Sequence, residues 1–200
     1  MDPPARALYN SAQLKGVEAM LMEDRYRQLL ASYRGNQIVA DIPGSLVRLW
    51  CEDYCAQNHG AELVEVNLKD AGASFTYLFD ISLQRTVVAY GVPAFAKHAR
   101  DAGRMAGHPN SAGPEFHRGH LMAHSIGGGT DINLVPQLGK LNIGEFRVLE
   151  RKVRDLAKQS LSCFYFVRPI YGDKSQTPTK FEQCVIQPPK SLLYALHENS

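Results

Sequence analysis

Apolar residues recur along the chain with two different periods, and each period predicts a different kind of element. Across residues 17–34 the apolar side chains fall at helical spacing, which predicts a first helix. Pro43 and the glycine after it interrupt the chain, and Ser45 is a suitable cap for a second helix that runs to about Asn58. The two helices are expected to form an N-terminal helical segment, residues 1–60.

From residue 61 onward the pattern changes to alternation of apolar and polar positions, which is typical of strands. Residues 61–68 and 73–81 both alternate, and the short Asp-Ala-Gly connection between them predicts a hairpin. A third strand is expected at 84–92. The apolar stretches 161–171 and 180–188 predict the two strands that close the chain. Short connections between such strands favour an antiparallel sheet.

The most regular helical pattern lies at residues 143–158. Its apolar positions recur at intervals of three and four and form one stripe, made by Phe146, Leu149, Val153 and Leu156. The other faces carry more Lys and Arg than Asp and Glu, which is typical of a solvated face and also suits a nucleic-acid backbone. The predicted fold class is therefore α+β, with residues 61–200 forming a second unit that packs with the N-terminal segment into one compact body.

Composition narrows the class of protein without identifying it. Hydrophobic residues make up 44% and charged residues 21% of the chain, with a net charge of +2, as in ordinary soluble domains. No apolar run is long enough for a membrane span, and the first residues lack the features of a secretory signal. We therefore expect a cytoplasmic protein or one delivered by a specialised secretion system. The four cysteines (Cys51, Cys55, Cys163 and Cys184) are expected to be reduced rather than bridged.

The chain concentrates histidine in the stretch HRGHLMAH, residues 117–124. A strand is expected to begin at His120, followed by a glycine-rich turn and then the helix that starts near Asn142. Histidine is the side chain best suited to take a proton from water near neutral pH. An amide oxygen of Asn142 suits Mg²⁺, which prefers oxygen ligands and keeps several waters. Glu150 lies eight residues further on, and its side chain is expected to reach back toward the ion's water shell.

Other interpretations of the same residues stay open. A zinc site made by His117, His120 and His124 is possible in principle, although neighbouring positions on one strand face opposite ways. Asn142 is also a good helix cap. The triple glycine after residue 126 is expected to be a turn, because the Walker pattern of a phosphate loop is missing.

The stretch from His117 to Glu150 resembles the DNA/RNA non-specific endonuclease family, which belongs to the ββα-metal nucleases. The family pattern is Asp-Arg-Gly-His, then Asn-x-x-Pro-Gln, then Leu-Asn-x-Gly-x-aromatic, and then Leu-Glu. The order and the spacing match here over about 35 residues, at His117 to His120, Asn133 to Gln137, Leu141 to Phe146, and Leu149 and Glu150. The resemblance implies a ββα-metal nuclease core.

The resemblance also implies a role for each matched residue. His120 would be the general base, and Asn142 would be the only direct protein ligand to Mg²⁺, for which Mn²⁺ is expected to substitute. Glu150 would hydrogen-bond a metal-bound water. Asn133 is expected to orient the site, and Arg118 to contact phosphate.

Two further points come from the comparison with the family pattern. The family has an arginine in the loop upstream of the motif, and Arg104 is our choice for it, with Arg100 as the second choice. The family's first motif residue is Asp, but this chain has His117. A histidine supplies no negative charge, so either Glu115 or Asp131 compensates or the metal is held more weakly.

Taken together, these residues predict an Mg²⁺-dependent endonuclease that cuts DNA and RNA without sequence preference and leaves 5′-phosphate ends. The alternatives are a non-catalytic nucleic-acid-binding module and a zinc-binding interaction module on the same scaffold. A broad nuclease endangers the cell that makes it. We therefore hold as a hypothesis that the chain is an antibacterial toxin kept silent by an immunity or inhibitor protein.

Overall fold

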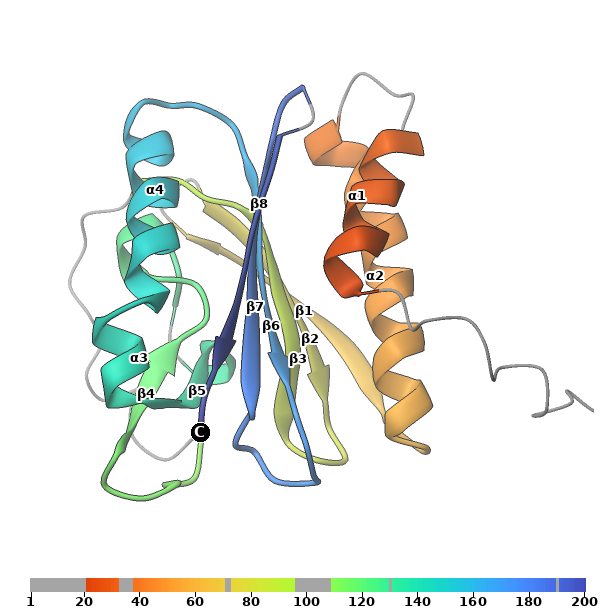
Figure 1. The fold of residues 1–200 in the computed structure, drawn as a ribbon, viewed down its shortest axis with the longest axis vertical. Helices are drawn as coiled ribbons and strands as arrows, with labels where there is room; N and C mark the ends of the chain where they lie inside the picture. The colour runs from red at the N-terminus through yellow and green to blue at the C-terminus, as the bar shows by residue number, and fades with distance from the viewer. Residues whose placement is uncertain (1–20, 33–37, 71–72, 96–108, 130, 190) are drawn as a thin grey trace, which may run out of the picture.

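A six-stranded antiparallel sheet divides the protein into two layers in the computed structural model (Figure 1). The structure describes residues 21–32, 38–70, 73–95, 109–129, 131–189 and 191–200. The strand order is β1–β2–β3–β6–β7–β8. The strands are β1 (Leu63–Asp70), β2 (Ala73–Asp80), β3 (Arg85–Val92), β6 (Phe164–Ile170), β7 (Lys180–Gln187) and β8 (Ser191–Glu198). The predicted α+β class and the first hairpin are confirmed.

The central strands are covered on both faces, because alternate residues enter two separate cores. In β6, Tyr165 and Val167 join one core, and Phe164 and Phe166 join the other. Such strands are apolar at nearly every position, since neither face meets water. The apolar runs of the sequence therefore marked the middle of the sheet.

Helices α1 (Met22–Ser32) and α2 (Ile38–Gln57) cover one face of the sheet (Figure 1). Their apolar side chains join the core on that face, with Tyr26 and Trp50 fully buried. The expected break at Pro43 is wrong, because α2 continues through it. A proline within a helix removes one backbone hydrogen bond, and the packing of α2 on the sheet outweighs that loss.

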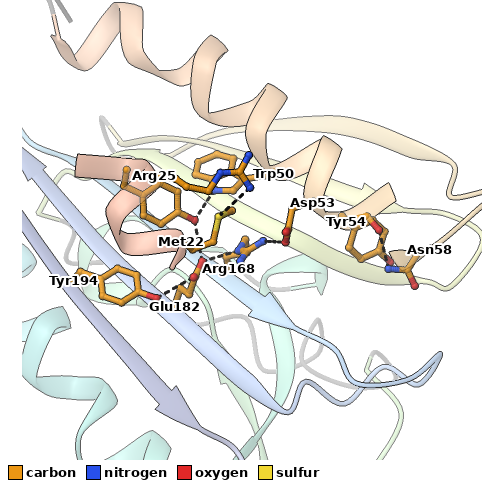
Figure 2. A network of polar contacts seen from close by, with 10 residues as sticks. Met22, Arg25, Trp50, Asp53, Tyr54, Asn58, Arg168, Glu182 and Tyr194 are labelled. Carbon is orange, nitrogen blue, oxygen red and sulfur yellow. Dashed lines mark hydrogen bonds and ion pairs between the residues drawn. The ribbon is translucent and has the colours of Figure 1, made fainter. Parts of the chain in front are cut away.

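A buried polar network joins this helical layer to the sheet (Figure 2). Arg168 of β6 donates to Glu182 of β7 at 2.6 Å and to Asp53 of α2 at 2.5 Å. The hydroxyls of Tyr26 and Tyr194 also donate to Glu182, each at 2.9 Å. Because Glu182 is only 2% exposed, water cannot stabilise its negative charge, and these hydrogen-bond donors do so instead.

The opposite face of the sheet carries the elements that hold the histidine motif (Figure 1). A two-stranded ribbon, β4 (Phe116–His120) with β5 (Leu134–Leu138), is followed by helices α3 (Gly139–Ile143) and α4 (Phe146–Lys158). Short 3₁₀ turns lie at His124–Ile126 and Asp131–Asn133. The strand expected to begin at His120 instead ends there, so His124 does not share a strand with it. The ribbon and the two helices form a ββα unit.

Strand β8 and the residue after it fasten this unit to the sheet. The sequence did not predict β8, which pairs with β7 along its whole length. Just beyond β8, the side chain of Asn199 accepts from the backbone N–H of Leu138 at 2.8 Å. It also donates to the carbonyls of Pro136 at 3.2 Å and Pro178 at 2.7 Å. The outer edge of β5 is thus paired with a side chain rather than with another strand.

The cysteines are reduced in the structure, as the sequence predicted. All four cysteines are free thiols, and Cys163 and Cys184 are buried in the two cores. Among the described helices, none has the length and apolar character needed to cross a membrane.

Candidate active site

A polar cleft of about 520 Å³ opens beside the ββα unit. It is bordered by the end of β4, the turn after it, and the facing sides of α3 and α4. Its lining residues are Arg118, His120, Ala123, His124, Ser125, Asn142, Ile143, Arg147, Glu150, Arg151 and Arg154. The cleft therefore gathers most of the residues that the sequence predicted to be functional.

The ribbon sets the position of His120. A side chain at Gly119 would come within 2.1 Å of the Gln137 amide oxygen, so only glycine allows β4 to lie this close to the buried glutamine on β5. His120 pairs in register with Leu134, the first residue of β5. The Arg-Gly-His motif thus places its histidine at the end of a closely packed ribbon.

Asn133 fixes the segment that follows His120. This asparagine is fully buried, and its side chain pairs with both backbone groups of Met122, accepting from the N–H at 2.8 Å and donating to the carbonyl at 2.8 Å. It also donates to the carbonyl of Gly129 at 2.7 Å. Asn133, the residue predicted to orient the site, thus bonds to backbone groups of the loop that follows His120.

Helices α3 and α4 bring an amide and a carboxylate to the cleft. The predicted apolar stripe of α4 is confirmed, with Phe146 and Val153 buried in the core, and it turns Glu150 toward the cleft. Burial raises the pKa of the Glu150 carboxyl to about 7, and the nearby Arg147 guanidinium opposes the rise. Asn142 reaches the same cleft from α3.

Arginine dominates the charge of the cleft. Four of the lining residues are arginines and one is a carboxylate, so the cleft carries a formal excess of three positive charges and suits a polyanion. Arg147, Arg151 and Arg154 follow one another at intervals of four and three on α4, which places them on one face of the helix. The basic side of α4, expected from the sequence to be mainly a solvated face, thus borders the cleft.

His117 does not line the cleft and instead lines a neighbouring pocket, which shares Arg118 with it. Its Nδ1 is 3.3 Å from the side-chain nitrogen of Asn142. Neither Glu115 nor Asp131 lines the cleft, so the compensation expected from them is not seen there. Arg104 and Arg100 lie outside the described residues.

The side chains of the cleft include oxygen ligands that a divalent cation accepts. An amide oxygen from Asn142 and a carboxylate from Glu150 are the ligand types that Mg²⁺ accepts, and the open volume leaves room for its waters. Within the described part of the chain, no three His, Cys, Asp or Glu side chains come together as a metal site. The three-histidine zinc alternative therefore has no support.

Comparison with known proteins identifies the family. The family model described as DNA/RNA non-specific endonuclease matches residues 70–186, more than half of the chain. The chain belongs to this family. Membership makes it a nuclease, as the motif predicted. The match includes β4, β5, α3 and α4, whereas helices α1 and α2 lie before it.

Two solved structures of NucA from Streptococcus agalactiae have a similar fold. The one with magnesium ion bound matches with a TM-score of 0.52 and 15% identity, over 76% of this chain and 89% of that one. The one with no metal bound matches with a TM-score of 0.52 and 14% identity, over 82% and 92%. These likenesses confirm the ββα-metal nuclease fold. A search of curated protein sequences found no significant match.

Proposed function

We propose that this nuclease hydrolyses phosphodiester bonds in both DNA and RNA, without sequence preference, with His120 as the general base and Mg²⁺ as the cofactor. The observation that supports the proposal most is that His120, Asn142 and Glu150 line one cleft together with four arginines. The three side chains come from three different elements, β4, α3 and α4. The fold therefore brings them together, because they are not neighbours in the sequence. The magnesium bound in one NucA structure supports the choice of metal.

The proposed reaction begins with the removal of a proton from water by His120. The resulting hydroxide attacks phosphorus, and the bond to the 3′-oxygen breaks. That oxygen takes up a proton from solvent, which leaves a 3′-hydroxyl and a 5′-phosphate. When bound at Asn142, a hydrated Mg²⁺ ion would offset negative charge on the departing oxygen. Glu150 would hold that ion through its waters. In this scheme Asn133 acts indirectly, because its hydrogen bonds keep the loop after His120 in place.

The four arginines of the cleft support the proposal that both DNA and RNA are substrates. Guanidinium groups recognise phosphate, which is common to every sequence and to both DNA and RNA. Arg118, whose Nε donates to the carbonyl of Pro109 at 3.2 Å, stands at the edge of the cleft and is proposed to contact phosphate. Arg104, which precedes the motif in the sequence, is proposed for the same task. Cleavage is then expected to weaken strongly as salt rises.

Degradation of plasmid DNA and total RNA by the purified protein tests the proposal. We expect degradation with Mg²⁺ or Mn²⁺, none in EDTA, and a loss of at least about 100-fold in His120→Ala, as is typical when a general base is removed. His59→Ala is the matched control, because His59 is an exposed histidine that does not line the cleft. Equal activity of His120→Ala and the wild type would refute the assignment of the base. A folded protein that binds but never cuts would indicate a binding module instead.

The biological setting proposed for this activity is an antibacterial toxin with a dedicated inhibitor. A nuclease that reads only phosphate attacks the nucleic acid of the cell that makes it. Expression in bacteria without an inhibitor should therefore stop growth, whereas His120→Ala should be tolerated at the same protein level. Normal growth with an enzyme that is active in vitro would count against the toxin role.

A further inference from the structure

The contact between His117 and Asn142 has no place in the mechanism above, although it touches the proposed metal ligand. The Asn142 side-chain nitrogen lies 3.3 Å from His117 Nδ1. An amide side chain has one donor end and one acceptor end. When the nitrogen end donates to the imidazole, the oxygen end is left for another partner.

A second observation is that the other side of the imidazole lies against Gly139. A methyl group at Gly139 would lie 2.9 Å from His117 Nε2 and 3.0 Å from Cε1. The ring therefore rests in the space that this glycine leaves, at the first residue of α3. The backbone N–H of Gly139 donates to the Glu115 carbonyl at 2.8 Å, which ties the start of α3 to the start of β4. His117 thus sits between Gly139 and Asn142.

We propose that His117 is a positioning residue, which accepts a hydrogen bond from the Asn142 amide nitrogen and so keeps the amide oxygen directed to the metal. This inference rests on the proposed role of Asn142. Without the acceptor at position 117, the amide is free to turn its nitrogen toward the cation, which repels it. Position 117 thus requires a hydrogen-bond acceptor, and it does not require a negative charge. A carboxylate and an imidazole meet that requirement equally.

Partners that orient a metal ligand typically change metal affinity by 10- to 100-fold when removed. Because His117 is exposed, we expect the lower end, a loss of about tenfold. His117→Phe removes the acceptor and keeps a ring. Gly139→Ala displaces the imidazole without altering it. His117→Asp supplies a different acceptor, so its metal affinity should stay near that of the wild type.

The test is direct Mn²⁺ binding to the intact protein without nucleic acid, followed by electron paramagnetic resonance of the free ion. We expect His117→Phe and Gly139→Ala each to bind about tenfold more weakly, and His117→Asp to bind like the wild type. Gly44→Ala is the control, because a methyl group there meets no atom within 4 Å. Unchanged affinity in both His117→Phe and Gly139→Ala, with binding lost in Asn142→Ala, would overturn this inference alone. Unchanged affinity in Asn142→Ala would overturn the proposed ligand as well.

The tautomer of His117 gives a second measurement that is independent of metal affinity. If Nδ1 accepts from Asn142, the neutral ring carries its proton on Nε2. Long-range ¹H–¹⁵N correlation spectra of the metal-free protein should then show an unprotonated Nδ1. In Asn142→Ala the preference for this tautomer should weaken. A ring that carries its proton on Nδ1 in the wild type would overturn the inference.

Discussion

Removal of the Asn199 side chain should destabilise the β4–β5 ribbon more than its position beyond the last strand suggests. This side chain is 3% exposed and makes three hydrogen bonds, to Leu138, Pro136 and Pro178. Each hydrogen bond contributes on the order of 1 kcal/mol net. Asn199→Ala also leaves the N–H of Leu138 buried without its acceptor, so the three losses are not offset by water. We expect the free energy of unfolding to fall by about 3 kcal/mol.

Urea denaturation followed by circular dichroism measures this loss. The neighbouring Glu198→Ala is the control, because Glu198 is exposed and its ion pair with Lys180 is worth less than about 1 kcal/mol. Hydrogen exchange should locate the effect, with the β5 amides exchanging faster in Asn199→Ala. If Asn199→Ala unfolds at the same urea concentration as Glu198→Ala, the side chain does not fasten β5 and the reasoning is wrong.

Three further predictions follow from other contacts. Arg168→Met should lower the free energy of unfolding by about 3–5 kcal/mol because it leaves Glu182 buried without its cation, whereas Lys180→Met, at an exposed pair, should cost less than about 1 kcal/mol in the same urea titration. The Glu150 carboxyl has a pKa of about 7 in the fold and 4.5 as an ordinary group, so the folded state binds more protons between these values. The metal-free protein should therefore lose stability as the pH rises from 4.5 to about 7. Thermal unfolding in EDTA should show this slope, and Glu150→Gln should flatten it. Gly119→Ala should destabilise the ribbon by about 1–3 kcal/mol, since its methyl group would overlap the buried glutamine opposite, and equal thermal stability to the wild type would contradict that packing.

The sequence predicted the elements whose pattern is set by burial. The hairpin of β1 and β2 and the stripe of α4 followed from periods of two and of three to four, because each meets the core along one side. The motif at residues 117–150 also predicted that His120, Asn142 and Glu150 lie close together, and these three line one cleft. The sequence did not predict β5 or α3. The sequence predicts a basic excess on the polar faces of α4, and only the fold shows that Arg147, Arg151 and Arg154 border the cleft.

The features that the sequence did not predict have physical causes. Strand β8 contains three Leu and one Ala, residue types that favour helices in isolation, and its pairing with β7 decides the outcome. Helix α2 continues through Pro43 because the buried Ile42, Leu46 and Trp50 hold it on the sheet. The contact of His117 with Asn142 joins residues 25 positions apart. No local pattern specifies a contact of that kind.

The attachment of β5 to a distant residue also bears on when the enzyme becomes active during synthesis. Leu138 and Asn199 are 61 positions apart. A nascent chain that already contains His120, Asn142 and Glu150 therefore still lacks the side chain that secures β5, and β7 still lacks β8. Because proteins are made from the N-terminus, the motif is translated well before its support exists. The ββα unit is therefore expected to gain this support only after β8, the last strand of the sheet, has been synthesised.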